Sequence, residues 1–209
     1  MAASGSAVLW GAAQEDWFGA VNHFARLTPW LHTPARLYAE YGTVLFAGVL
    51  MCAWLLTRRD GDLDRVTAAL WAPLGALIAI GVNQFLVAAF AEPRPYTVLP
   101  DALVLVSRST DYSFPSDHAV MAGAVTVGVL LANRKLGALT AGLAVLMAVT
   151  RVYVGAHFPL DVAAGLAVGA IVALGSYGAA RPVFSRLVLR LSRTPVRPFV
   201  TAQPVGTSR

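Results

Sequence analysis

Long apolar stretches separated by short polar segments make up most of the chain. A helix of about 20 apolar residues crosses a hydrocarbon core roughly 30 Å thick. Stretches close to that length lie at about residues 36–57, 66–90, 116–132, 137–153 and 159–180. This pattern predicts an all-α fold, a polytopic integral membrane helical bundle with about five transmembrane helices.

The two ends of the chain carry a different pattern. Over the first 35 residues, acidic, basic and aromatic side chains are scattered among apolar ones, which favours an interfacial helix over a secretory signal. After the last span, apolar residues recur at helical spacing between arginines, which suits a short helix on anionic headgroups; a disordered cytoplasmic end is the alternative. These apolar residues are Phe184, Leu187, Val188 and Leu191. We therefore expect an N-terminal interfacial segment at 1–35, a transmembrane domain at 36–180 and a basic cytoplasmic tail at 181–209.

Composition and charge agree with membrane insertion and orient the bundle. Hydrophobic residues make up 57% of the 209 residues, charged residues 13%, and the mean hydropathy is +0.63. Basic residues gather at 58–65, at 133–135 and after residue 180, three places that five crossings put on one side of the membrane. The positive-inside rule makes that side cytoplasmic, so the pI of 9.9 reflects topology rather than nucleic-acid binding. The opposite side, with the loop at about 91–114 and the turn at 151–161, should face outward.

Three arginines stand on the outward side, where positive residues should be scarce. They are Arg94, Arg108 and Arg151. Basic groups at such a place are candidates for holding an anion. The stretch "FPSDH" at 114–118 adds a second feature, because Pro115 favours the first position of a helix. The amides that follow it would then be unpaired donors at a helix start, which bind phosphate readily.

Two histidines and a carboxylate supply further groups that phosphoryl transfer needs. Asp161 follows His157 by four residues, close enough for its carboxylate to accept the Nδ1 proton of the ring. An imidazole oriented in this way presents its other nitrogen as a nucleophile or a base, while His118 at a facing helix mouth can protonate a leaving oxygen. Arg94 and Arg151 would neutralise the oxygens of the transferring phosphoryl group.

These residues fall into three ordered motifs. The motifs are "RP" at 94–95, "PSDH" at 115–118, and Arg151 followed by His157 and Asp161. They resemble the signature motifs of the type-2 phosphatidic acid phosphatase superfamily, in which membrane lipid phosphatases are similar to vanadium haloperoxidases, and the resemblance covers about residues 35–180. More narrowly, "EPRPY", "SFPSDH" and "TRVYVGAHFPLDV" resemble the bacterial undecaprenyl-diphosphatase branch, whose second motif typically carries an aspartate, here Asp117, instead of a glycine.

The resemblance implies a role for each matching residue. His157 would be the nucleophile that forms a phosphohistidine, Asp161 its orienting carboxylate, and His118 the acid that protonates the departing lipid phosphate. The residues implied in binding the phosphoryl oxygens are Arg94, Ser116 and Arg151. The family needs no metal for this chemistry, and the sequence has no further cluster of acidic residues and histidines typical of metal ligands. No metal and no cofactor are therefore expected.

Three neighbouring residues are further candidates for substrate binding, and one family residue is missing. Pro115 opens the second motif, Arg108 is either a phosphate ligand or a solvated loop residue, and Asp117 either tunes His118 or favours its helix terminus. The broader family places a lysine seven residues before the first-motif arginine, where this chain has Val87. The undecaprenyl-diphosphatase branch resembles this chain in lacking that lysine.

The function that follows is lipid phosphate hydrolysis. We predict an enzyme that converts undecaprenyl diphosphate, or a related polyprenyl diphosphate, to the monophosphate and inorganic phosphate on the outer face of a bacterial plasma membrane, recycling the carrier lipid of the cell wall. Alternatives are a phosphatase of phosphatidylglycerol phosphate, phosphatidic acid or another lipid, a vanadate-dependent oxidase, and a lipid-binding or transport protein without catalysis. Transport is disfavoured because the polar residues collect at one face instead of tracing a path through the bundle. The expected partners are the substrate and membrane lipids, with no nucleic acid.

Overall fold

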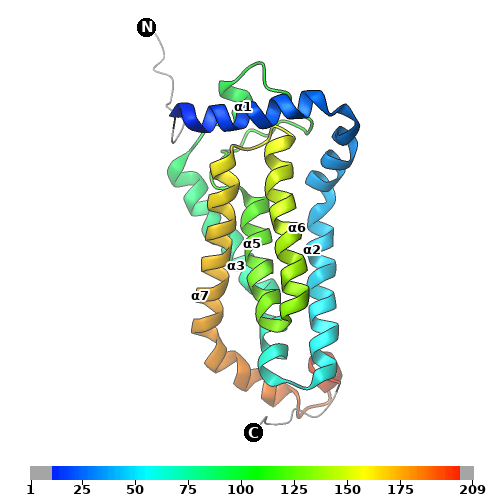
Figure 1. Cartoon of the computed structure of the whole chain (residues 1–209). Helices are drawn as coiled ribbons and strands as arrows, with labels where there is room; N and C mark the ends of the chain where they lie inside the picture. Colours follow the sequence, from blue (N-terminus) through cyan, green and yellow to red (C-terminus); the bar gives the residue numbers. More distant parts are fainter. Residues whose placement is uncertain (1–10, 203–209) are drawn as a thin grey trace.

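A computed structural model describes residues 11–202, and within this range the chain is helical without β-strands. The elements are α1 (Gly11–Leu27), a short 3-10 turn η1 (Pro29–Leu31), α2 (His32–Asp60), α3 (Leu63–Phe90), α4 (Pro95–Val98), α5 (Asp117–Ala132), α6 (Arg134–Tyr153), α7 (Pro159–Leu191) and α8 (Arg197–Val200). Figure 1 shows α2, α3, α5, α6 and α7 side by side, with α1 laid across one end of this bundle and the C-terminal segment at the other.

The long helices have the length and surface of membrane-spanning segments. Among the described residues, four segments are long and apolar enough to cross a membrane: Pro29–Asp60, Leu63–Val98, Arg134–Tyr153 and Pro159–Leu191. Large apolar side chains such as Phe85 and Ile171 are exposed on their outer faces, where lipid rather than water suits them. The predicted all-α membrane bundle is confirmed.

The remaining long helix, α5, is short and central. Its 16 residues span about 24 Å at 1.5 Å per residue, less than a hydrocarbon core of roughly 30 Å. It packs against α3, α6 and α7, so protein surrounds most of it. Small residues permit this close packing: a Cβ at Gly169 would collide with the carbonyl oxygen of Val120, and a Cβ at Gly123 with that of Leu166.

Polar caps and basic side chains gather at the end of the bundle opposite α1. Asp62 accepts hydrogen bonds from the amides of Asp64 and Arg65 and so caps α3, while Asn133 caps α6 through the amide of Leu136. The basic segments 58–65 and 133–135 lie at this end together with the last turns of α7 (Figure 1).

The C-terminal apolar residues belong to α7 itself. The helix continues past Pro182 to Leu191, beyond the predicted end of the last span at residue 180, and its last part turns across the end of the bundle (Figure 1). There Val188 packs in one cluster with Val66 and Val200. The apolar spacing noted in the sequence therefore reflects a face that packs against the start of α3.

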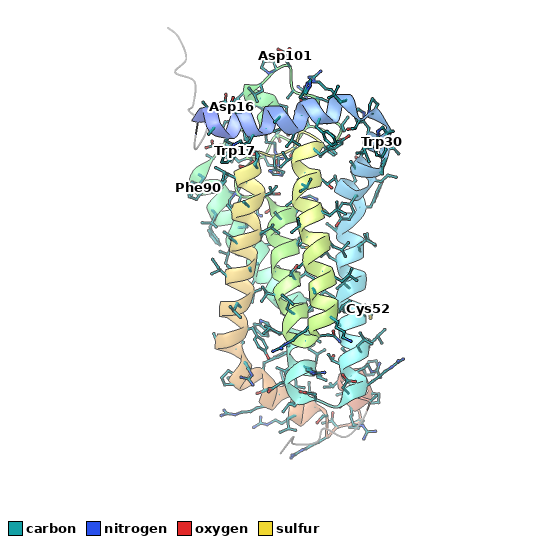
Figure 2. The ribbon with its side chains drawn as sticks, viewed as in Figure 1. Asp16, Trp17, Trp30, Cys52, Phe90 and Asp101 are labelled. Atoms are coloured by element: carbon teal, nitrogen blue, oxygen red, sulfur yellow. The ribbon has the colours of Figure 1, made fainter. Side chains whose placement is uncertain are left out.

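Helix α1 covers the other end of the bundle. Its buried residues, Gln14, Phe18, Asn22 and Ala25, recur at helical spacing and face the bundle. Trp17 and Trp30 are exposed at this same end (Figure 2), which is the usual position of tryptophans at a membrane surface. The first ten residues of the predicted N-terminal segment lie outside the described range. In contrast, Cys52 is exposed on α2 toward the opposite end (Figure 2).

Candidate active site

Three connections at the α1 end bring the predicted site residues together. Arg94 immediately precedes α4 and lies in the long connection between α3 and α5. Ser116 and His118 sit at the start of α5, and Arg151 lies in the last turn of α6. His157 occupies the short turn between α6 and α7, and Asp161 lies in the first turn of α7. Most of these side chains border one cavity of about 460 Å³, lined by Arg94, His118, Arg151 and His157 among others.

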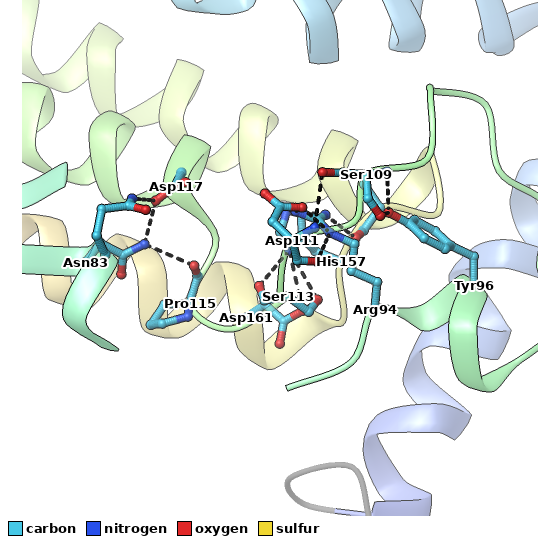
Figure 3. A network of polar contacts seen from close by, with 12 residues as sticks. Asn83, Arg94, Tyr96, Ser109, Asp111, Ser113, Pro115, Asp117, His157 and Asp161 are labelled. Carbon is cyan, nitrogen blue, oxygen red and sulfur yellow. Dashed lines mark hydrogen bonds and ion pairs between the residues drawn. The ribbon is translucent and has the colours of Figure 1, made fainter. Parts of the chain in front are cut away.

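The imidazole of His157 is buried and held on both nitrogens (Figure 3). Its Nδ1 lies 2.9 Å from the carbonyl oxygen of Ser113, which can only accept, so Nδ1 carries the proton. Its Nε2 therefore carries the lone pair, and Nη1 of Arg94 lies 3.2 Å away. The structure thus places the unprotonated ring nitrogen beside a guanidinium group.

The carboxylate of Asp161 acts on His157 less directly than its spacing predicts. Its Oδ2 lies 3.5 Å from Nδ1 of His157, longer than a hydrogen bond. The same oxygen accepts hydrogen bonds from the hydroxyl of Ser113 and from the amide of Phe158 at 2.8 Å. The Nδ1–H group of the ring donates to the Ser113 carbonyl oxygen instead. Asp161 therefore fixes the Ser113 hydroxyl and the Phe158 amide around the histidine, and its charge stays close to the ring.

Burial lowers the pKa of His157 below its ordinary value, and the positive charges of Arg151 and Arg94 act in the same direction. The nearby carboxylate of Asp161 raises it, but this effect does not outweigh burial. His157 is therefore neutral near pH 7, the state that a nucleophilic imidazole requires.

Arg94 is buried and its guanidinium group is tied in three directions. Nη1 donates to the carbonyl oxygen of Ala156 at 3.0 Å, next to its contact with His157. Nε and Nη2 both donate to Oδ1 of Asp111, at 3.1 and 2.8 Å. Burial raises the pKa of Asp111, but the Ser109 hydrogen bond and the charge of Arg94 together hold it below its ordinary value. A charged Asp111 therefore keeps the guanidinium plane fixed beside Nε2 of His157.

Four buried polar atoms at or beside the site have no hydrogen-bond partner within the described part of the chain. Two belong to donors, Nε of Arg151 and the hydroxyl of Ser116, and two are acceptors, Oδ1 of Asp161 and Oδ1 of Asn83. Arg151 is 8% exposed and Ser116 is fully buried. Unsatisfied buried polar atoms are rare in folded proteins and need an explanation. Arg151 lines the cavity, so a tetrahedral anion there would supply an acceptor for its Nε, whereas Ser116 lies behind the lining.

The start of α5 differs from the expectation based on Pro115. The helix begins at Asp117 with Ser116 as the N-cap, so Pro115 precedes the cap and does not occupy the first helical position. The amide of Ser116, expected to be free, donates to the carbonyl oxygen of Asp161 at 3.1 Å. This bond joins the starts of α5 and α7 and leaves the amides of the first turn of α5 as the candidates for an anion.

Asp117 lines the cavity, and its side chain is also tied to α3. Its Oδ1 accepts hydrogen bonds from Nδ2 of Asn83 at 2.7 Å and from Nε2 of Gln84 at 3.0 Å, both on α3 (Figure 3). Asn83 also donates to the carbonyl oxygen of Pro115 at 3.1 Å. Asp117 therefore anchors the start of α5, which carries His118, to α3.

Two further positions depart from the sequence-based picture. Arg108 is absent from the cavity lining, and its guanidinium carbon lies 5.5 Å from the ring centre of Tyr96 in a cation–π contact. Val87, at the position where the broader family has a lysine, lines the cavity but contributes no charge to it. Among the described residues, no group of three or more histidine, cysteine or acidic side chains is arranged to hold a metal ion.

Two residues at the centre of the site were not singled out from the sequence. The carbonyl oxygen of Ser113 accepts a hydrogen bond from His157, the Ser113 hydroxyl donates to Asp161, and Asp111 anchors Arg94. Ser113 is the first letter of "SFPSDH", so its adjacency to the second motif was the available signal. Asp111 has no such mark, because its partner Arg94 is 17 positions away in a connection without regular structure.

Comparisons with known proteins identify relatives of the chain. A family model described as the PAP2 superfamily matches residues 68–184. Undecaprenyl-diphosphatase BcrC of Bacillus subtilis is 32% identical over 155 residues, covering 74% of this chain and 78% of the relative. An undecaprenyl-diphosphatase of Sulfolobus acidocaldarius is 38% identical over 97 residues, 44% of this chain and 46% of the relative.

Solved structures show a similar fold. The crystal structure of Aquifex aeolicus LpxE has a TM-score of 0.59 and 25% identity, covering 78% of this chain and 93% of that one. A transmembrane PAP2-type phosphatidylglycerolphosphate phosphatase of Bacillus subtilis has a TM-score of 0.57 and 20% identity, covering 82% and 86%. At 20% identity, the similarity to the Bacillus subtilis structure supports the fold alone.

Proposed function

The chain belongs to the PAP2 superfamily and is a membrane lipid phosphatase, and from this premise we propose that its substrate is undecaprenyl diphosphate or a related polyprenyl diphosphate. The products are the polyprenyl monophosphate and inorganic phosphate. Relatives named undecaprenyl-diphosphatase in both Bacillus subtilis and Sulfolobus acidocaldarius support this choice of substrate.

The observation that carries the proposal is the pairing of His157 with Arg94 at the cavity. Nε2 of His157 has the lone pair because Nδ1 donates to Ser113, and a guanidinium nitrogen lies 3.2 Å from it. A terminal phosphoryl group bound by Arg94 and Arg151 is then placed for attack by Nε2. The positioned charges neutralise its oxygens in the transition state.

The reaction has two steps with balanced protons. In the first, Nε2 of His157 bonds to the terminal phosphorus, the bond to the bridging oxygen breaks, and His118 donates its proton to that leaving oxygen. The charge that develops on the ring is met by the Ser113 carbonyl and the Asp161 carboxylate. In the second step, water gives a proton to His118 and bonds to phosphorus as the phosphorus–nitrogen bond breaks, which releases phosphate and restores neutral His157.

The lining of the cavity suits a charged head attached to an apolar tail. Besides the cationic residues, the cavity is bordered by Ala39 and Tyr41 of α2 and by Val87 of α3. Tyr41 is exposed on the surface of the bundle. We infer that the diphosphate enters from this side while the polyprenyl chain stays in the bilayer along α2 and α3.

An assay of phosphate release tests the proposed substrate. Detergent-purified full-length protein is given undecaprenyl diphosphate, phosphatidic acid and phosphatidylglycerol phosphate in parallel, with and without a chelator. We expect the diphosphate to give the highest kcat/KM, and we expect this activity to survive the chelator. His157→Gln, which keeps a polar side chain but has no imidazole, should abolish turnover and serves as the blank. Preference for a phospholipid phosphate would reject the polyprenyl substrate, and loss of activity on chelation would reject the metal-free mechanism.

We also propose that the active site faces the outer side of a bacterial plasma membrane. The basic segments at 58–65 and 133–135 lie at the opposite end of the bundle, which the positive-inside rule assigns to the cytoplasm. In a Cys52→Ser background, Asp101→Cys should react with a membrane-impermeant maleimide on intact cells. Protection of this cysteine until the cells are lysed would reverse the orientation.

A further inference from the structure

We propose that α1 is a positioning element of the active site, in which Asn22, supported by Gln14, fixes the turn that carries His157. The effect on turnover rests on the phosphatase function proposed above, whereas the effect on the turn itself does not. Helix α1 lies outside residues 68–184, so the family match assigns it no role.

Asn22 is joined to one backbone position of the long α3–α5 connection by two hydrogen bonds. Its Nδ2 donates to the carbonyl oxygen of Leu103 at 2.8 Å, and its Oδ1 accepts from the amide of Leu103 at 3.0 Å. The side chain is 5% exposed. A side-chain amide is the only group that supplies this donor and acceptor at that spacing, so the pairing is specific to asparagine at this position.

The backbone of Leu103 packs directly against the turn that carries His157. Gly155 adopts a positive φ of 79°, and a Cβ there would collide with the carbonyl oxygen of Leu103. The amide of Leu105 donates to the carbonyl oxygen of Val154 at 3.0 Å. The connection held by Asn22 therefore lies directly on the backbone two residues before His157.

Gln14 holds the other side of the same turn. Its Oε1 accepts a hydrogen bond from the amide of Leu160 at 3.1 Å, and the side chain is 1% exposed. Leu160 lies in the first turn of α7, next to Asp161, where helix amides need external acceptors. Two side-chain amides of α1, two helical turns apart, thus hold the start of α7 directly and the segment before His157 through the connection at Leu103.

An interfacial anchor alone does not require this arrangement. An anchor needs apolar side chains toward lipid and polar ones toward water, but α1 directs two neutral amides inward onto backbone groups of the site. A misplacement of about 1 Å at reacting atoms can cost on the order of 10²-fold in rate. Contacts that fix the turn therefore matter to turnover more than to membrane attachment.

The test compares Asn22→Leu with His23→Leu. Leucine is close to asparagine in size, favours helix more strongly and removes both hydrogen bonds. His23 is the next residue of α1 and is exposed, so it is the matched control. Asn22→Asp is the second variant, because it keeps the acceptor for the Leu103 amide and loses the donor.

Two measurements are made on the full-length protein in detergent. Hydrogen–deuterium exchange should rise at residues 103–105 and 154–158 in Asn22→Leu, with α3, α5 and α6 unchanged. On undecaprenyl diphosphate, or on whichever lipid phosphate the unmodified protein hydrolyses best, kcat should fall about tenfold or more with KM nearly constant. Asn22→Asp should lie between, and His23→Leu should match the unmodified protein.

The outcomes separate the positioning role from the proposed function. If the exchange pattern changes as expected but the unmodified protein prefers a different lipid phosphate, the positioning role stands and the substrate assignment fails. If exchange at 154–158 is unchanged, or if kcat falls equally in His23→Leu, the positioning role is wrong. Uniformly faster exchange throughout the bundle would likewise reject it in favour of a purely stabilising role.

Discussion

The two ends of the bundle both carry charged residues, but they hold them in opposite ways. At the α1 end, Arg94, Arg151 and Asp161 are buried, and Arg94 and Asp161 both hydrogen-bond to groups of the turn that carries His157. At the other end, ion pairs such as Arg65 with Asp60 join side chains that are 53% and 51% exposed. The charges at the centre of the site are thus buried, whereas this ion pair is solvated.

The difference reflects what each set of charges does. A buried charge loses its hydration, so it persists only where several partners replace the lost water. Arg94 meets this condition through Asp111, Ala156 and His157. An exposed pair contributes little to stability because water and salt screen it. We therefore assign the buried charges to the proposed chemistry and the exposed arginines to the proposed membrane orientation.

The largest expected effect comes from changing the buried arginine conservatively. Arg94→Lys keeps the charge but cannot contact Asp111, Ala156 and His157 at once, since an ammonium group lacks the planar fork of donors. We expect kcat/KM for the lipid diphosphate to fall about 10²- to 10³-fold, the cost of losing a preorganised donor to the transition state.

Arg65→Lys at the opposite end is the matched control. Arg65 is also paired with an aspartate, Asp62, at 3.5 Å, but both side chains are about half exposed. We expect no measurable change in kcat/KM or in thermal stability. Equal losses in the two variants would remove the distinction between the ends.

An intermediate effect is expected at Asp117. Asp117→Ala removes the acceptor for Asn83 and Gln84, and the start of α5 loses its tie to α3. We expect a destabilisation of about 1–3 kcal/mol, as for buried polar groups left unpaired, together with reduced turnover. Asp117→Asn retains an oxygen in the same place and should remain close to the unmodified protein in both thermal unfolding and phosphate release. A loss as large in Asp117→Asn as in Asp117→Ala would instead assign the effect to charge near His118.

The smallest expected effect is a pH dependence of stability. Burial lowers the pKa of His157 in the folded protein, so below about pH 6.5 the unfolded chain binds a proton that the folded chain resists. Stability contributed by neutral His157 is therefore present above that pH and is lost as pH falls. Between pH 7.5 and 5.5, the melting temperature in detergent should drop more for the unmodified protein than for His157→Gln. Identical drops would contradict a depressed pKa.

The architecture and the gathering of the motif residues at one site were predictable from the sequence because both have local signals. Apolar stretches of spanning length are read directly from the chain, and the motif residues stand at fixed spacings. Residues His118, Arg94, Arg151 and His157 border one cavity as expected from their positions at helix ends on one side.

The contacts that arrange those residues were not predictable in the same way. Asp111, Ser113 and Asn22 act on partners 17, 44 and 81 positions away, and no periodicity links them. Asp117 binds Asn83 and Gln84 because these two side chains of α3 face it across a helix contact. The amide of Ser116 was expected to be free, but α7 begins close enough for the Asp161 carbonyl to accept it. Such pairings depend on three-dimensional packing.

The short length of α5 has a consequence for how the protein is made. At about 24 Å, this helix does not span a hydrocarbon core of roughly 30 Å without its neighbours. Its polar start, with Ser116 and Asp117, finds partners only after α3 and α7 are in place. We expect α5 to enter the bilayer together with α6 as a helical hairpin, so that completion of the active site waits for the synthesis of α7.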